Sequence, residues 1–257
     1  MEIRKLNAAR GWIWVKQGYQ LIMRNPLLAI ALALICALFM FMAFGVPLFG
    51  PLLVVVLMPV VIAGYMRVCR ALEEEEEVEL MQLLEGFQKH AARLVALGGF
   101  AMLGLMITSI AMIAIGGEAF AALLESVKAT NDPERLADAM WAAGSGVALS
   151  LMVGVVLVFT LMLAMQYAPM LVFFGDMQPL AALHASLSGS LRNIVPYTVY
   201  SLIVQMIALA LGMLPYGIGL IVLLPLGLTS LYVSYRNIFP FPNEVVTGQS
   251  EAPGTEA

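Results

Sequence analysis

Two arginines, Arg70 and Arg236, occupy matching positions in the sequence. Their side chains are the groups in this chain with the clearest potential to bind a ligand. Arg70 follows Pro59 by eleven residues, Arg236 follows Pro225 by eleven residues, and tyrosines lie close to both arginines. A guanidinium can donate two parallel hydrogen bonds to one phosphate group. We therefore expect both arginines to bind the phosphate of an anionic lipid, unless they serve only as positive anchors and the glutamates that follow Arg70 neutralise it.

Other basic and aromatic residues lie close to the ends of apolar segments and extend this set. The candidate lipid-headgroup contacts are Arg10, Arg24, Arg70, Arg192 and Arg236, and the candidate interfacial aromatic anchors are Trp12, Trp14, Tyr19, Tyr232 and Tyr235. Arginine is attracted to anionic phosphates, and tryptophan and tyrosine prefer the headgroup level of a bilayer. The ligands that these residues predict are membrane lipids.

Catalytic and metal-binding patterns are missing from the sequence. It has no phosphate-binding loop, no zinc-ligand spacing, no nucleophile elbow and no catalytic pair of carboxylates. Its 18 methionines are scattered, and no second residue supports a catalytic or ligating role for His184. We therefore expect neither an enzyme nor a bound cofactor.

The composition indicates that most of the chain is surrounded by lipid. Residues of the apolar set make up 61% of the 257, only 12% are charged, and the mean hydropathy is +0.92. Soluble domains are about half apolar and about a quarter charged. The net charge of -4 comes with no basic domain, so the sequence gives no indication of nucleic-acid binding.

Six apolar runs approach or reach the roughly 17–25 residues that a spanning helix needs. They cover residues 27–44, 52–67, 94–115, 147–174, 197–214 and 216–235. The predicted fold is all-α, with about six transmembrane helices in three hairpins, and forms one integral membrane domain over residues 1–240. Residues 241–257 are rich in Pro, Gly, Thr, Ser and Glu, which predicts a disordered cytoplasmic tail.

The distribution of basic residues predicts the orientation. With six spans, eleven of the 13 lysines and arginines lie on the side of the N-terminus and two lie on the opposite side. Because positive charge is retained in the cytoplasm, we expect a multi-pass protein of a bacterial inner membrane with both termini cytoplasmic.

Amphipathic segments precede the hairpins and suggest an internal repeat. Residues 10–24 and 180–194 each place apolar residues on one face and polar residues on the other, as helices that lie along a membrane surface do. Gly86 and Phe87 stand before the middle hairpin where Gly18 and Tyr19 stand before the first. We therefore expect up to three copies of an amphipathic helix followed by a hairpin, all in the same orientation.

Five consecutive glutamates, Glu73 to Glu77, follow the second predicted span. Arg70 can pair with Glu73 or Glu74 at helical spacing. The run is interpreted either as a solvated face or as a docking surface for a basic partner.

Three segments resemble a family of uncharacterised bacterial inner-membrane proteins: W-x-x-x-G-Y-x-x-x-x-x-N-P over residues 14–26, L-x-x-S followed by P-Y over residues 183–197, and Y-R-N-I-F over residues 235–239. They are more distantly similar to the membrane domain of some glycerophosphoryl diester phosphodiesterases. The resemblance implies a fold and a location without a reaction, since the chain has no room for the catalytic phosphodiesterase domain.

Two functions are the main hypotheses. The first is a non-enzymatic protein that organises lipid or a protein partner, including a second copy of itself, at the cytoplasmic leaflet. The alternative is a transporter or channel for a small or amphiphilic molecule, with a cavity among three similar hairpins. A transporter needs a polar, water-accessible path, whereas a scaffold has a filled, apolar centre; a membrane enzyme would need clustered polar groups at one interface.

Overall fold

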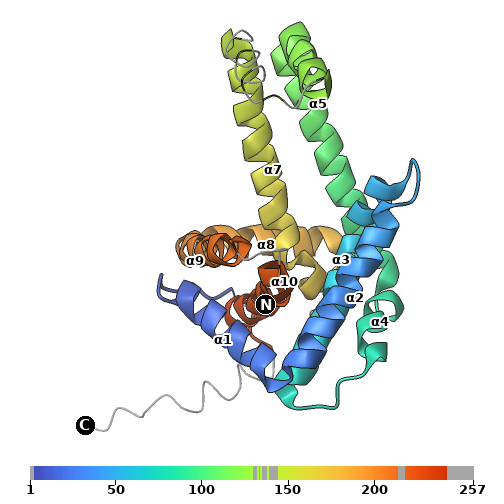
Figure 1. Ribbon diagram of the computed structural model, residues 1–257, viewed down its shortest axis with the longest axis vertical. Helices are drawn as coiled ribbons and strands as arrows, with labels where there is room; N and C mark the ends of the chain where they lie inside the picture. The colour runs from blue at the N-terminus through green and yellow to red at the C-terminus, as the bar shows by residue number, and fades with distance from the viewer. Residues whose placement is uncertain are drawn as a thin grey trace.

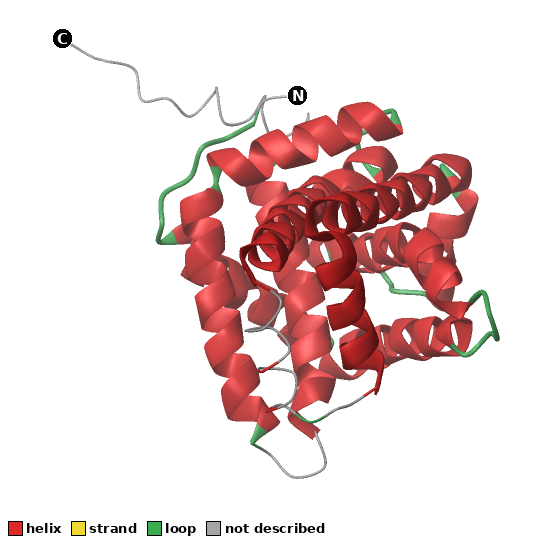
Figure 2. Cartoon of the chain, turned by 90° about the horizontal axis from the view of Figure 1, so that it is seen from above, coloured by secondary structure: helices red, strands yellow, loops and turns green. Residues whose placement is uncertain are grey.

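The computed structural model describes the chain apart from residues 1–2, 130–131, 133, 135–137, 139–143, 214–217 and 242–257. All of its secondary structure in the described part is helical (Figures 1 and 2), which confirms the all-α prediction. The helices are α1 (Arg10–Arg24), α2 (Pro26–Phe44), α3 (Gly50–Glu74), α4 (Leu80–Gln88), α5 (Ala91–Ala129), α7 (Gly144–Phe173), α8 (Pro179–Arg192), α9 (Ile194–Gly212) and α10 (Ile218–Ile238). The predicted tail lies outside the described residues except for Phe241.

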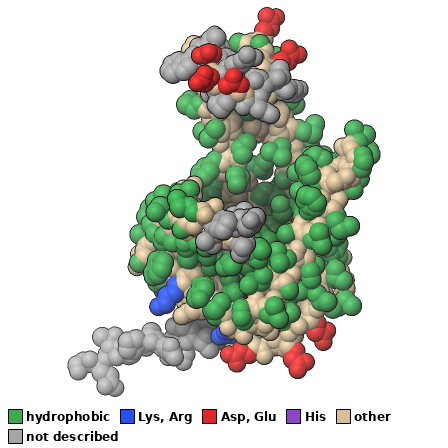
Figure 3. Space-filling model, in the orientation of Figure 1, with side chains coloured by type: hydrophobic (Ala, Val, Ile, Leu, Met, Phe, Trp, Pro, Cys, Tyr) green, Lys and Arg blue, Asp and Glu red, His purple; other side chains and the backbone are tan. Residues whose placement is uncertain are grey.

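Five of the described helices are long and apolar enough to cross a bilayer: α2, α3, α5, α7 and α9. The sixth predicted span begins at residue 216, outside the described residues, and continues as α10. α5 changes direction at Gly117, whose φ of 55° breaks the helix close to the predicted end of the third span. Acidic side chains lie at the top and bottom of Figure 3, and the surface between them is mostly hydrophobic, as a bilayer requires.

Three amphipathic helices precede the three hairpins. α1 covers the predicted residues 10–24, and α8 ends two residues before the predicted 194. α4 is the corresponding helix before the middle hairpin, where Gly86 was matched to Gly18. Each amphipathic helix is followed directly by a hairpin: α2 with α3, α5 with α7, and α9 with α10.

Each amphipathic helix packs on the last helix of the preceding hairpin. Because the first amphipathic helix packs on the last hairpin, the three repeat units form a closed ring. α4 packs on α3, α8 packs on α7, and α1 packs on α10. Two of these contacts are close enough to need a glycine. The two glycines, Gly18 in α1 and Gly86 in α4, occupy equivalent positions in the repeat. A Cβ built on Gly18 would lie 2.5 Å from the Oγ of Ser230, and one built on Gly86 would lie 3.0 Å from the backbone nitrogen of Gly64. This shared geometry supports the predicted repeat.

The α7–α8 contact uses a serine instead of a glycine. The Ser186 hydroxyl donates to the Leu163 carbonyl oxygen at 2.9 Å and accepts from the Tyr167 backbone N–H at 3.0 Å. Those two backbone groups would bond directly in an uninterrupted α-helix. The hydroxyl of α8 is therefore inserted into α7 two residues before Pro169, where the proline ring already disturbs the helix.

The last helices of the three hairpins, α3, α7 and α10, meet in the centre. Their contact is filled by large side chains that are less than 2% exposed, among them Tyr65, Met66, Tyr167, Phe173, Tyr232 and Tyr235. The Tyr167 hydroxyl lies 3.1 Å from the Ser234 Oγ, which joins α7 to α10. Away from this centre the hairpins diverge: α5 and α7 run together to the top of Figure 1, whereas α9 is viewed nearly along its axis.

Candidate functional site

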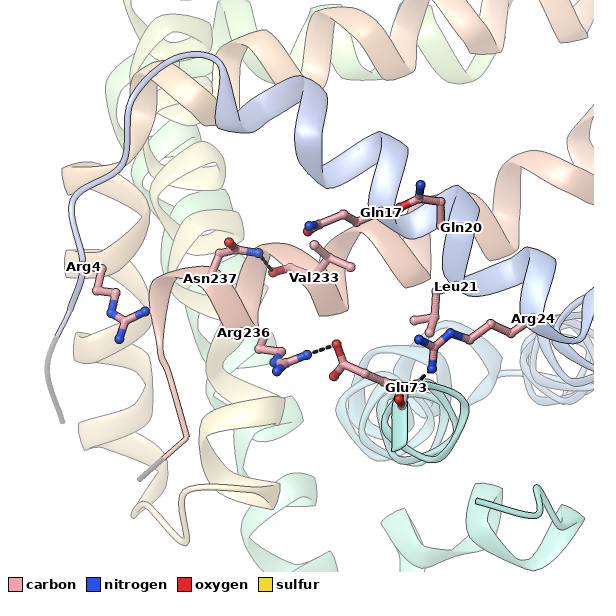
Figure 4. A pocket seen from close by; sticks show the side chains of 9 residues that line it. All are labelled: Arg4, Gln17, Gln20, Leu21, Arg24, Glu73, Val233, Arg236 and Asn237. Atoms are coloured by element: carbon pink, nitrogen blue, oxygen red, sulfur yellow. Dashed lines mark hydrogen bonds and ion pairs between the residues drawn. The ribbon is translucent and has the colours of Figure 1, made fainter. Parts of the chain in front are cut away.

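A polar cavity of about 420 Å³ lies between α1 and the C-terminal ends of α3 and α10 (Figure 4). Its lining residues come from four separate parts of the chain: Arg4, Gln17, Gln20, Leu21, Arg24, Glu73, Val233, Arg236 and Asn237. Three arginines and one glutamate give this lining a formal charge of +2 (three positive, one negative). We call it the arginine cavity.

α1 supplies the polar wall of the arginine cavity through helical spacing. Gln17, Gln20 and Arg24 are three and four residues apart and therefore share one face of the helix. The opposite side of α1 is apolar and packs on α9 and α10, which fixes how the polar face is turned. The sequence predicted this polar face, because amphipathic periodicity is a local property.

The N-terminal segment brings Arg4 to the cavity. The backbone N–H of Arg4 donates to the Ile238 carbonyl oxygen at 3.1 Å. Asn193, at the junction of α8 and α9, donates from its side-chain nitrogen to the Arg4 carbonyl oxygen at 2.9 Å and accepts from the Leu6 N–H at 2.8 Å. The sequence did not indicate Arg4 as a site residue, because Asn193 is 189 residues away from it and Ile238 is 234 residues away.

Glu73 is the acidic group of the cavity and joins α3 to α10. Its carboxylate forms an ion pair with Arg236 and accepts a hydrogen bond from the Tyr232 hydroxyl at 2.7 Å. Arg24 donates to the backbone carbonyl oxygens of Leu72 and Glu73 at 2.9 and 2.6 Å. An arginine suits this place because the C-terminal carbonyls of a helix carry partial negative charge.

Most glutamates of the run form ion pairs with arginines of the same chain, and the pairing of Arg70 with Glu74 confirms the expectation from helical spacing. Besides the Glu73–Arg236 pair, Glu74 pairs with Arg70 at 2.8 Å, Glu75 with Arg24 at 3.6 Å and Glu76 with Arg67 at 2.9 Å. The arginines come from α1, α3 and α10. The run therefore connects the ends of three helices, although its more exposed pairs each contribute little stability.

The structure brings only part of the predicted arginine set together. Arg24 and Arg236 line the cavity, and Arg10 lies beside it, with its Nη1 3.5 Å from the Oδ1 of Asn237. Arg70 is separate: its guanidinium lies over the rings of Phe174 and Phe241, 5.7 and 4.6 Å from their centroids. Arg192 is exposed at the end of α8.

The predicted aromatic anchors divide into two groups. Trp12 and Tyr19 are 55% and 51% exposed, as anchors at a bilayer surface must be. For Trp14, Tyr232 and Tyr235 the prediction was wrong, because all three are fully buried in protein. Trp14 packs edge-on against Tyr200, and Tyr235 belongs to a cluster with Tyr167 and the phenylalanines near the end of α10.

Two other cavities differ in chemistry from the arginine cavity. One of about 620 Å³ lies beside the loop after α3 and is lined by four glutamates together with Arg24, Asn25 and three aliphatic residues. The other, of about 180 Å³, lies between α2, α3 and α10 and is lined mainly by aliphatic side chains. Within the described residues, no group of three or more His, Cys, Asp or Glu side chains is placed to hold a metal ion.

No family model matches this chain, and no solved structure matches it. A protein of Burkholderia thailandensis that is described as a probable inner membrane protein is 28% identical over 263 residues, covering 93% of this chain and 94% of the relative. The expected similarity to the membrane domain of glycerophosphoryl diester phosphodiesterases stays a prediction. With five described helices able to cross a bilayer, the chain is a multi-pass membrane protein that fits an uncharacterised group of bacterial inner-membrane proteins.

Proposed function

We propose that this protein is a non-enzymatic membrane protein that organises anionic lipid at the cytoplasmic leaflet of a bacterial inner membrane. The observation that carries the proposal is the ring of α1, α4 and α8. Each helix leaves large apolar side chains exposed: Trp12 and Tyr19 on α1, Leu80 and Leu84 on α4, and Leu180 and Leu191 on α8. Exposed apolar residues next to basic ones are typical of helices that lie in the headgroup region of anionic membranes.

The centre of the molecule favours this function over transport. The contact among α3, α7 and α10 is occupied by buried aromatic and aliphatic side chains, with Tyr167 and Tyr235 at its middle. A transporter or channel needs a path lined by polar groups through that region. The filled centre supports a scaffold.

Lipid composition around the purified protein tests the proposal. The full chain is extracted with its surrounding lipid in a polymer-bounded disc, and the lipids are compared with those of the bulk membrane by mass spectrometry. We expect phosphatidylglycerol and cardiolipin to be enriched relative to phosphatidylethanolamine. Equal composition in the disc and the bulk membrane would contradict a lipid-organising role, and a co-purified protein in fixed ratio would favour a partner-organising one.

The orientation is tested separately by cysteine labelling. Single cysteines at Val78, Leu180 and Glu125 are introduced, and intact cells are treated with a thiol reagent that does not cross the membrane. We expect labelling at position 125 alone, since the basic residues predict that positions 78 and 180 are cytoplasmic. Labelling of position 78 or 180 from outside contradicts the proposed orientation.

A further inference from the structure

We propose that the arginine cavity is a binding site for one phosphate group, provided either by a phospholipid headgroup or by a free phosphate. The lipid source rests on the proposed function, whereas the binding of phosphate itself does not. The main observation behind this proposal is that Arg4, Arg24 and Arg236 line one cavity (Figure 4). The amide side chains of Gln17 and Gln20 line the same cavity.

Charge and hydrogen-bonding capacity favour an anion. The lining has a formal charge of +2, and although Glu73 pairs with Arg236 and Glu75 pairs with Arg24 at 3.6 Å, no described carboxylate pairs with Arg4. The side chains of Arg4, Gln17 and Gln20 make no hydrogen bond or ion pair with any described residue, so their donors are available to a ligand. A guanidinium and two amides suit the several acceptor oxygens of a phosphate.

The cavity also has a suitable size and is accessible. Its volume of about 420 Å³ falls within the about 300–1,000 Å³ of small-molecule sites. Arg4, Gln17, Gln20 and Arg24 are all exposed, so a ligand can enter from the surface between α1 and the N-terminal segment. The side of the cavity next to α10 is closed by buried Val233.

The repeat provides an internal comparison that favours a specific site. Arg70 is the repeat equivalent of Arg236, but it is stacked on Phe174 and Phe241 and paired with Glu74 at 2.8 Å. Arg236 is likewise paired, with Glu73, so the two copies differ in what else lines the space around each arginine. Among the described residues, the copy that ends with Arg236 is the one whose arginine lies beside both the polar face of an amphipathic helix and Arg4.

The test uses the full chain in nanodiscs of phosphatidylcholine and two probes. In the first arm, inorganic phosphate is titrated at constant ionic strength and binding is followed by the change in thermal unfolding temperature. In the second arm, phosphatidylglycerol is added to the nanodiscs and the number of retained molecules is measured by native mass spectrometry. Each arm compares the parent with Arg4→Gln, Glu73→Gln and the matched control Lys5→Gln, which removes an exposed cation next to Arg4 but outside the lining of the cavity.

We expect Arg4→Gln to weaken binding about tenfold, because a charged donor is lost. Glu73→Gln should strengthen binding about three- to tenfold, because the charge of the lining rises from +2 to +3. Lys5→Gln should leave it unchanged. Opposite effects of two variants in one cavity are not expected from a loss of folding, and Arg4→Gln removes no side-chain hydrogen bond or ion pair with a described residue.

The two probes distinguish a phospholipid headgroup from free phosphate as the ligand. They also allow the phosphate site and the proposed lipid-organising function to fail independently of each other. Variant-dependent phosphate binding without lipid retention supports the site with free phosphate as its ligand and contradicts the lipid-organising role. Variant-dependent lipid retention supports the site with a headgroup as its ligand. Equal binding by the parent, Arg4→Gln and Glu73→Gln in both arms overturns the cavity as a site, even where enriched lipid upholds the proposed function.

Discussion

The two hydrogen bonds of the Ser186 hydroxyl hold α8 against α7, so we expect their removal to lower the free energy of unfolding. Ser186→Ala removes the donor to the Leu163 carbonyl oxygen and the acceptor for the Tyr167 N–H, at 2.9 and 3.0 Å. Ser190 still donates to the same carbonyl oxygen at 3.3 Å, whereas the Tyr167 N–H loses its partner in a buried place. A buried unsatisfied donor costs about 1–3 kcal/mol, and the second lost bond adds about 1 kcal/mol. The expected loss of unfolding free energy is about 2–4 kcal/mol.

The measurement is the thermal unfolding temperature of the purified protein in detergent, followed by size-exclusion chromatography after heating. For a chain of this size, 1 kcal/mol corresponds to about 2–4 °C, so Ser186→Ala should unfold about 4–16 °C below the parent. Ser109→Ala is the control, because its exposed hydroxyl donates only to the Leu105 carbonyl oxygen of its own helix, at 2.9 Å. If Ser186→Ala unfolds at the same temperature as Ser109→Ala, the hydroxyl does not join the two helices as inferred.

Two further substitutions test the ring of amphipathic helices and the placement of the N-terminal segment. Gly64→Ala should lower stability by about 1–3 kcal/mol, because its Cβ would overlap the backbone oxygen of Leu83 on α4; Gly99→Ala, which meets open space, should be neutral or slightly stabilising in the same thermal assay. Asn193→Ala removes the side chain that holds Arg4, so it should weaken phosphate binding without changing any charge and expose the N-terminal segment to limited proteolysis. Unchanged proteolysis of Asn193→Ala would show that this side chain does not hold the segment.

Local patterns were sufficient for the helices. α1 begins and ends at the predicted residues, because an amphipathic face is set by residues three and four apart. The spanning segments were found because a bilayer demands about 20 apolar residues in succession. The end of the third predicted span, at residue 115, lies close to the break of α5 at Gly117, where glycine permits the φ of 55°.

The candidate site was only partly predictable. Arg24 and Arg236 were named from their positions at helix ends, and both line the cavity. Arg70 shares with Arg236 the proline eleven residues earlier and a nearby tyrosine, but it is covered by Phe174 and Phe241, which approach it from other parts of the chain. The glutamates after Arg70 indicated its pairing with Glu74, but no local pattern indicated this stacking, because it depends on what packs next to the arginine.

The sequence by itself determined that this chain is helical, which segments are apolar enough to enter a bilayer, and which face of each amphipathic helix is polar. All three follow from interactions within a few residues and from the solvent that each segment needs. Only the tertiary structure decided that Trp14 and Tyr235 face protein and not lipid, since an apolar side chain satisfies both environments equally well. It likewise decided that Arg4 and Glu73 meet in one cavity, because that contact depends on the packing of segments far apart in the chain.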